Sequence, residues 1–173
     1  GGLNYGSSGQ GTSSHLAAEY FQQLAGVKML HVPFRGSSQA LPQLVNGDVD
    51  LFFDMVGTGM PQVDAHKVDV LAITSKKRLS SLPALPTVSE EGYPGFEMTA
   101  WFTLVAPPAT PSNVTATLSK ALTAALKDET VRKRLLAMGI EPGDGSAQAL
   151  STQIRTELPI IEALVKRANI EVQ

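Results

Sequence analysis

Residues 5–16 read Tyr-Gly-Ser-Ser-Gly-Gln-Gly-Thr-Ser-Ser-His-Leu and join a short apolar segment to a helical pattern. The apolar residues of that pattern recur with helical spacing at Leu16, Ala17, Tyr20, Phe21 and Leu24. Gly26 follows, where a glycine commonly ends a helix. A strand-to-helix turn of this kind exposes backbone N–H groups at a helix N-terminus, where the dipole favours an anion. The turn therefore predicts a grip for a small anion, most simply a carboxylate; a flexible Ser/Gly linker and an ordinary helix cap are the alternatives.

The chain has 173 residues, of which 43% are hydrophobic and 17% charged, with a net charge of −2 and no cysteine. This length and composition suit one domain or two small ones with an apolar core. The weak charge disfavours nucleic acid as a partner, and the missing cysteines exclude disulfides and thiolate chemistry. No apolar run approaches the length of a membrane span. The chain starts Gly-Gly rather than Met and has no signal peptide, so we expect a processed chain or a piece of a longer one.

Strand and helix signals alternate over the first 74 residues. Strands are expected near residues 3–5, 27–33, 49–55 and 68–74, and the last of these should be buried on both faces. Helices are expected between them, up to Gly26, up to Asn46 with Gly47 as its stop, and over residues 60–66. Pro42 fits the second helix only in its first turn. This alternation predicts an α/β fold with a parallel sheet.

The loops at residues 7–12, 34–38 and 54–58 all follow predicted strands. They should therefore meet at one edge of the sheet, where open α/β sheets bind ligands. Arg35 could pair with a carboxylate, although a surface arginine fits equally well. Asp54 could hold a ligand amine, a water or loop N–H groups, or could simply form a local turn.

The second part of the sequence changes character. Residues 75–96 are rich in Pro and Gly and should form an ordered excursion, and residues 96–105 should form a long strand crossing between two lobes. Three helices should follow, one after Thr110-Pro111, one over residues 128–138, and one capped by Ser146 and bent or broken near Pro159. These helices cannot easily close a core alone, so the tail is expected to need sheet from residues outside this chain.

Several kinds of chemistry are disfavoured by spacing. Adjacent Ser14 and His15 point in different directions at a helix start, so a triad with Asp54 is not expected, and no G-x-S-x-G elbow occurs. The histidines lack metal-ligand spacing. Residues 9–11 lack both the third glycine of a dinucleotide fingerprint and the Lys of a P-loop. We expect neither an enzyme nor a metal or other cofactor.

Several stretches, taken in order, resemble one family. They are Tyr5-x-Ser7-x-Gly9-x-Gly11-Thr12-x-x-His15-Leu16, His31-Val32-Pro33-Phe34-Arg35-Gly36, Gly47-x-Val49-Asp50-x-x-Phe53-Asp54, Leu71-Ala72-x-Thr74-Ser75-x-x-Arg78, Leu82-Pro83-x-Leu85-Pro86-Thr87-Val88-x-Glu90, Gly92-x-Pro94-Gly95-Phe96-Glu97 and Trp101-Phe102-x-Leu104-x-Ala106-Pro107. The chain resembles the Bug-type extracytoplasmic solute receptors, the substrate-binding proteins of tripartite tricarboxylate transporters. It departs from the family's pattern at Phe34 and Arg35, where Tyr and Lys are usual.

The resemblance implies a periplasmic-binding-protein-like, type II (Venus-flytrap) architecture of two lobes, one essentially complete and the other partial. Residues 1–97 would be the second lobe, and residues 98–173 would return to a first lobe that lacks its N-terminal portion. It also implies a periplasmic receptor with a signal peptide upstream, membrane components of a tripartite transporter as partners, and no membrane insertion of its own. The ligand would be a di- or tricarboxylate, an acidic amino acid or an aromatic acid. The expected ligand-binding residues are Ser7, Gly9, Gln10, Gly11, Thr12, Arg35 and Asp54.

Two other functions remain as alternatives. Effector domains of LysR-type regulators share the two-lobe plan, so the chain could be a ligand-sensing module. A hydrolase using Ser14 and His15 is the third possibility.

Overall fold

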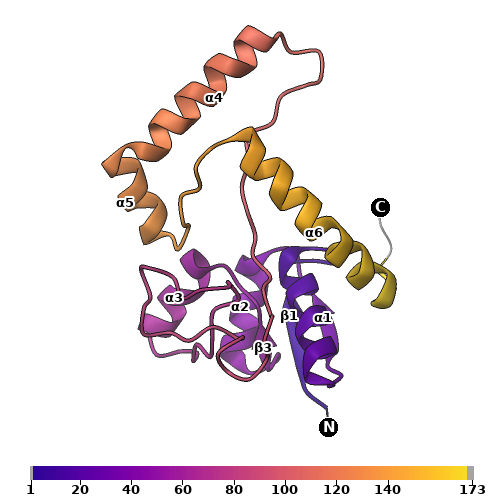
Figure 1. The fold of residues 1–173 in the computed structure, drawn as a ribbon. Coiled ribbons are helices and arrows are strands. Elements are labelled where there is room, and N and C mark those ends of the chain that lie inside the picture. Colours follow the sequence, from indigo (N-terminus) through magenta and orange to yellow (C-terminus); the bar gives the residue numbers. More distant parts are fainter. Residues whose placement is uncertain (1, 171–173) are drawn as a thin grey trace.

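Three short parallel strands organise the first half of the chain in the computed structural model, which describes residues 2–170 (Figure 1). They are β1 (Asn4–Ser7), β2 (Leu30–Pro33) and β3 (Leu51–Phe52), in the sheet order β2-β1-β3. Tyr5 pairs with His31 on one side and with Leu51 on the other. The predicted α/β class is confirmed, and the strand that leads into the glycine loop is the central one.

Each strand is followed by a helix: α1 (Ser13–Ala25), α2 (Ser37–Asn46) and α3 (Val56–Asp64). The predicted stops are confirmed, since Gly26 and Gly47 end α1 and α2 in the left-handed conformation with φ of 66° and 80°.

Two details of these helices differ from prediction. Pro42 lies inside α2, beyond the first turn. The third helix begins at Val56 rather than at residue 60. It begins early because the N–H groups of Thr58 and Gly59 both donate to the carbonyl of Met55, at 3.1 and 2.9 Å. Glycines that were expected to open a turn therefore belong to the first turns of the helix.

Residues 65–111 contain no helix and no strand of the sheet. The predicted strand over residues 68–74 is wrong: it contributes one bridge, Ile73 to Thr87, and Leu71 is 70% exposed. The predicted strand over residues 96–105 is also wrong, and Phe102 is 73% exposed. A strand requires a neighbour that accepts and donates hydrogen bonds along its length, and among the described residues the pairing of these segments is limited to the Ile73 bridge and a bond from the Met98 N–H to the Thr74 carbonyl at 3.0 Å.

Three helices make up the rest: α4 (Ser112–Lys127), α5 (Glu129–Ala137) and α6 (Ala147–Arg167). The predicted cap is confirmed, because the Ser146 hydroxyl accepts from the Ala149 N–H at 3.1 Å. The predicted break at Pro159 is not present, since α6 runs through it. Among the described residues, no helix is both long and apolar enough to cross a membrane.

The helix α6 returns to the first half and packs on α1 (Figure 1). Leu16 of α1 is buried against Leu164 of α6 and against Ile170, with further apolar residues around them, namely Tyr20, Met98, Ile161, Val165 and Ala168. The helix that carries the glycine loop at its start is therefore held by the end of the chain.

A cluster of aromatic rings holds residues 93–96 against the first half. Phe96 is 1% exposed, and its ring centroid lies 5.0 Å from Tyr20, 6.5 Å from Phe21 and 6.4 Å from Phe53. Tyr93 meets Phe21 edge-on at 5.0 Å. This aromatic cluster joins α1 to Phe53, the residue directly before Asp54.

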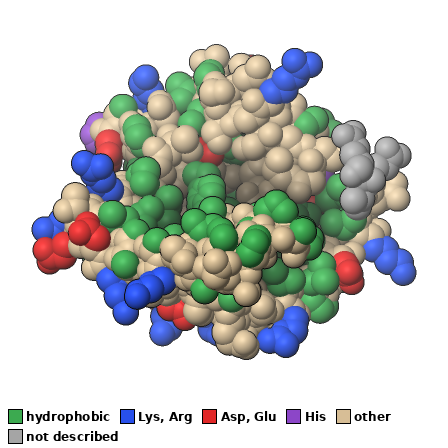
Figure 2. Space-filling view, turned by 90° about the horizontal axis from the view of Figure 1, so that it is seen from above, with side chains coloured by type: hydrophobic (Ala, Val, Ile, Leu, Met, Phe, Trp, Pro, Cys, Tyr) green, Lys and Arg blue, Asp and Glu red, His purple; other side chains and the backbone are tan. Residues whose placement is uncertain are grey.

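The second half leaves much apolar surface uncovered. Seen from above, hydrophobic side chains gather around a hollow (Figure 2). The large apolar residues exposed on this half are Trp101, Phe102, Leu104, Val105, Val114, Leu118, Met138, Ile154, Leu158 and Ile160. As expected from the sequence, these helices do not close a core among the residues described.

Candidate functional site

The loops after the three strands meet at one edge of the sheet, as predicted. The Gly36 N–H donates to the Ser8 carbonyl at 3.1 Å, and the Ser8 and Ser37 hydroxyls lie 3.3 Å apart. The Ser37 hydroxyl in turn donates to Asp54 Oδ1 at 2.6 Å. Because parallel strands present their carboxyl ends to the same edge, this is the position at which an open α/β sheet binds a ligand.

The glycine loop, residues 7–12, is shaped by hydroxyl groups. Thr12 Oγ1 donates to the Gly9 carbonyl at 2.7 Å and lies 2.9 Å from Ser14 Oγ. Ser14 Oγ also accepts from the Ser8 N–H at 2.8 Å. Gly9 and Gly11 have φ of 136° and 75°, values that residues with a side chain rarely adopt. The loop is an ordered turn, which removes the flexible-linker alternative.

The glycine loop leaves backbone donors available. Among the residues that the structure describes, none accepts a hydrogen bond from the N–H of Gln10 or Ser13. Gln10 and Ser13 are both exposed, and Ser13 is the first residue of α1. The positive end of the helix dipole adds to these donors, so the loop can bind an anion without a charged side chain.

Ser7 lies beneath the glycine loop. It is 0% exposed, and its hydroxyl is 2.6 Å from His31 Nε2 and accepts from the Gly9 N–H at 3.2 Å. Its side chain therefore supports the loop from below and offers no surface to a ligand in this structure.

Of the two charged residues expected at the site, Asp54 is hydrogen-bonded within the protein and Arg35 is exposed. Asp54 accepts hydrogen bonds from Ser37 and, at 2.7 Å, from the Thr58 hydroxyl, so its carboxylate ties β3 to α2 and α3. Arg35 is exposed, and its backbone N–H donates to Gln39 Oε1 at 3.1 Å. Within residues 2–170 its guanidinium forms no ion pair, so it can turn toward a bound anion.

The structure gives no support to a catalytic triad. Ser14 bonds to Ser8 and Thr12, while His15 Nδ1 accepts from the Gly11 N–H at 3.0 Å. Neither side chain is hydrogen-bonded to the other or to Asp54. In the described part of the chain no group of three or more His, Asp or Glu residues could hold a metal ion.

Sequence reasoning did not predict a stack of rings behind the glycine loop. The imidazoles of His15 and His31 are 3.9 Å apart and nearly parallel, and Tyr5 stacks on His31 at 4.9 Å. The Tyr5 hydroxyl donates to Glu19 Oε1 at 2.6 Å. The stacking of His31 beside Tyr5 could have been predicted only with the register of β2 against β1, which pairs these two residues. The sequence does not give that register.

Burial keeps both imidazoles neutral. It lowers the pKa of His31 to about 4, helped by the neighbouring His15, while the Glu19 carboxylate acts in the opposite direction. Burial also lowers the pKa of His15, again opposed by Glu19. Desolvation raises the pKa of the Tyr5 phenol, with the hydrogen bond to Glu19 acting in the same sense.

The stability of the chain should therefore fall on mild acidification. Unfolded His31 takes a proton near its ordinary pKa of 6.5, whereas the folded residue does so only near 4. Within this window the unfolded state binds more protons, so the free energy of unfolding decreases as pH drops, by about 1–2 kcal/mol after allowing for solvent screening. Urea titrations at pH 7.5 and 4.5 measure this. In His31→Gln the free energy of unfolding should differ less between pH 7.5 and pH 4.5. A difference as large as in the unmodified protein would show that His31 is not responsible for the pH dependence.

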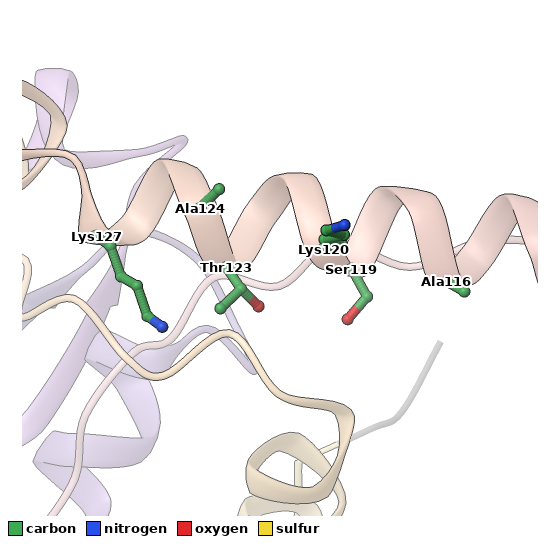
Figure 3. Close-up of a pocket in the computed structure, with 6 residues that line it drawn as sticks. All are labelled: Ala116, Ser119, Lys120, Thr123, Ala124 and Lys127. Carbon is green, nitrogen blue, oxygen red and sulfur yellow. The ribbon is translucent and has the colours of Figure 1, made fainter.

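A hollow of about 560 Å³ lies along α4, away from the three loops. Its lining residues, Ala116, Ser119, Lys120, Thr123, Ala124 and Lys127, all belong to that helix, and Ser119, Thr123 and Lys127 point to the same side (Figure 3). No second element of the lining contributes a polar group opposite them. We therefore place the candidate site at the three loops.

A parallel α/β lobe whose loops meet at the carboxyl ends of its strands has the geometry of a ligand-binding edge, which enzymes and binding proteins share. Residues 1–170 match the family described as "Tripartite tricarboxylate transporter family receptor", and the chain belongs to this family. The predicted family is thereby confirmed, and with it the expectation that the chain is not an enzyme. The match also favours the receptor over the LysR-type alternative.

The similar solved structures include one with adipate and one with bound malate. The chain is 36% identical to R. palustris Rpa4515 with adipate (TM-score 0.88, covering 97% of this chain and 56% of that one). It is 32% identical to MatC from Rhodopseudomonas palustris with bound malate (TM-score 0.82, 94% and 56%). It is 33% identical to the periplasmic binding protein BugD (TM-score 0.82, 98% and 58%).

The chain spans about half the length of the curated relatives it matches. A UPF0065 protein from Pseudomonas sp. (strain P51) is 37% identical over 158 residues, which are 91% of this chain and 47% of that protein. The structural neighbours are likewise covered by a little more than half. This agrees with a two-lobe binding-protein fold of which one lobe is partial.

Proposed function

We propose that the chain is part of a receptor that captures a small carboxylate, with the glycine loop as the anion grip. The observation that carries this proposal is the pair of N–H groups of Gln10 and Ser13, which have no acceptor among the described residues and belong to exposed residues in the turn that leads into α1. Adipate and malate in two relatives support a dicarboxylate as the ligand. A tricarboxylate, an acidic amino acid or an aromatic acid would offer the same carboxylate to the loop.

In this proposal the expected site residues have different roles. Gly9 and Gly11 give the loop its shape, Gln10 and Thr12 border the anion, and Arg35 supplies a mobile positive charge that can bind a second carboxylate. Asp54 and Ser7 hold the loops in place. Malate has a second carboxylate for Arg35 to bind, whereas acetate has only the one that the glycine loop binds. Arg35→Gln should therefore weaken malate binding more than acetate binding.

We further propose that residues 1–97 form one lobe of the receptor and that residues 98–173 belong to the other. The uncovered apolar side chains of residues 101–105 and of α4–α6 support this division, since they lack a sheet to pack against. Closure of two lobes around the ligand would then complete the site. Delivery to the membrane components of a tripartite transporter, in the periplasm, follows from the family and is part of the same proposal.

Replacing Thr12 tests the grip. Thr12→Val keeps the shape of the side chain but removes the hydroxyl that bonds to Gly9 and Ser14, so the turn loses its internal support. Calorimetry with malate and adipate on the full-length protein should show an affinity at least about tenfold lower, which corresponds to ~1.4 kcal/mol.

Thr12→Ser is the matched control, because it keeps the hydroxyl, and it should bind within about twofold of the unmodified protein. Gly11→Ala should behave like Thr12→Val because φ is 75° at this position. Unchanged affinity in both Thr12→Val and Gly11→Ala would place the ligand elsewhere.

A further inference from the structure

His15 forms a hydrogen bond that the ligand grip itself does not explain. Its side chain is buried, at 5% exposed, and its Nδ1 accepts from the Gly11 N–H at 3.0 Å. An imidazole nitrogen that accepts cannot carry a proton, so the neutral ring has its hydrogen on Nε2. The ring thereby occupies one N–H of the glycine loop and fixes its direction.

The surroundings of His15 hold the ring in place. His31 of β2 stacks on it, Tyr5 of β1 lies beyond at 6.3 Å, and Glu19 of α1 has an oxygen 3.9 Å from Nε2. These are the titratable groups that face the ring. Glu19 is already bonded to the Tyr5 hydroxyl and to Gln22, at 2.6 and 2.8 Å. The ring can therefore neither rotate nor move without disturbing three elements.

We propose that neutral His15 is a positioning residue for the glycine loop, and that protonation of His15 releases the Gly11 N–H and loosens the grip on an anion. This inference rests on the proposed carboxylate site and adds a pH dependence to it. It concerns the residue behind the loop, which does not itself contact the ligand.

Protonation of His15 would place two hydrogen-bond donors, the Gly11 N–H and the His15 Nδ1–H, against each other. Charged imidazole carries a hydrogen on Nδ1, which would face the Gly11 hydrogen across 3.0 Å. The hydrogen bond is lost and the two groups repel, so Gly11 must rotate or the ring must leave the stack. Either movement changes the turn from Gly9 to Thr12, which orients the exposed N–H groups of the grip.

The burial of His15 and the charges around it set the pH at which His15 becomes protonated. Burial disfavours the charged ring and lowers the pKa of His15, while Glu19 partly offsets this effect. The His31 ring, stacked on the same face, is also held neutral. The Gly11 N–H should therefore stay bonded to His15 at neutral pH and be released only at a pH below the ordinary range of histidine titration.

Nuclear magnetic resonance on the full-length protein tests the position of the ring without any ligand. At pH 7.5 His15 should show a hydrogen on Nε2 only, and the Gly11 amide should exchange slowly with solvent. His15→Phe keeps a ring for the stack but removes the acceptor, so Gly11 exchange should accelerate about tenfold or more. His15→Asn places an uncharged oxygen where Nδ1 lies and should restore slow exchange.

Affinity for malate and adipate at pH 7.5 and 5.5 tests the coupling. The unmodified protein should lose several-fold more affinity on acidification than His15→Asn, whose amide does not titrate; the difference should stay below about tenfold because the pKa of His15 is lowered. Titration of the ligand itself is common to both proteins and cancels in this comparison. His66→Asn is the matched control, because His66 is exposed with φ of 54°, and its pH dependence should equal that of the unmodified protein.

The two readouts separate this inference from the proposed function. Rapid Gly11 exchange in the unmodified protein, or slow exchange in His15→Phe, would overturn the positioning role whatever the ligand. Equal pH dependence in the unmodified protein and His15→Asn would overturn the switch. If no carboxylate binds at pH 7.5 the proposed function fails, and the exchange measurement still decides whether His15 positions the loop.

Discussion

Replacing Phe96 with alanine is expected to lower the free energy of unfolding of the 173-residue chain by about 3–5 kcal/mol. The ring is 1% exposed and lies among Tyr20, Phe21 and Phe53. Removing it leaves a cavity between α1 and the residue before Asp54, so the lost contacts are not regained elsewhere. Urea unfolding followed by circular dichroism measures the change.

Phe102→Ala is the matched control for this experiment. It makes the same chemical change at a ring that is 73% exposed, and it should shift the free energy of unfolding by less than about 0.5 kcal/mol. A similar loss in both variants would mean that the aromatic cluster does not anchor residues 93–96.

Gly139→Ala should destabilise the chain by about 2–4 kcal/mol, which combines the strain of a left-handed residue with overpacking. Gly139 has φ of 70°, and a Cβ there would lie 2.3 Å from Val56 Cβ. The neighbouring contact is also tight, although less so, because a Cβ on Gly57 would lie 3.3 Å from the Met138 carbonyl oxygen. Thermal and urea unfolding of the variant measure the loss.

Gly143→Ala is the control, since nothing lies within 4 Å of its Cβ position. Val56→Gly combined with Gly139→Ala removes the clash, so the two changes should cost less together than the sum of the separate changes. Full additivity would show that Gly139, which follows α5, does not touch Val56 at the start of α3 in solution.

Helix ends were predictable because the interactions that end a helix are local. Gly26, Gly47 and Ser146 act through their own φ angles or hydroxyl groups, within a few residues of the helix. The start of α3 was missed because the Met55 carbonyl and the Asp54 carboxylate bind groups that the sequence alone presents as a glycine turn.

Strands were less predictable, because a strand depends on a partner that is distant in the sequence. Residues 68–74 and 96–105 have strand composition, yet Leu71 and Phe102 are largely exposed. Apolar β-branched and aromatic residues indicate that a segment could join a sheet. They do not indicate whether a neighbouring strand is present.

The meeting of the three loops was predictable, since parallel strands share one edge. The arrangement behind them was not. Burial of Ser7 and the stacking of His15 on His31 both depend on the register of β1 against β2. The family resemblance identified the residues of the glycine loop but not which of them face inward.

Residues 100–109 run exposed between the two halves, while α6 comes back to pack on α1 through Leu164 and Leu16. The two halves are thus joined by the peptide chain and also by tertiary contacts, at α1 with α6, at Val56 with Gly139 and at Ser80 with Glu141. A nick between Trp101 and Phe102 would cut no helix and no pairing within the sheet. The protein is therefore suited to fragment complementation, in which two separately expressed pieces reassemble through α1 and α6.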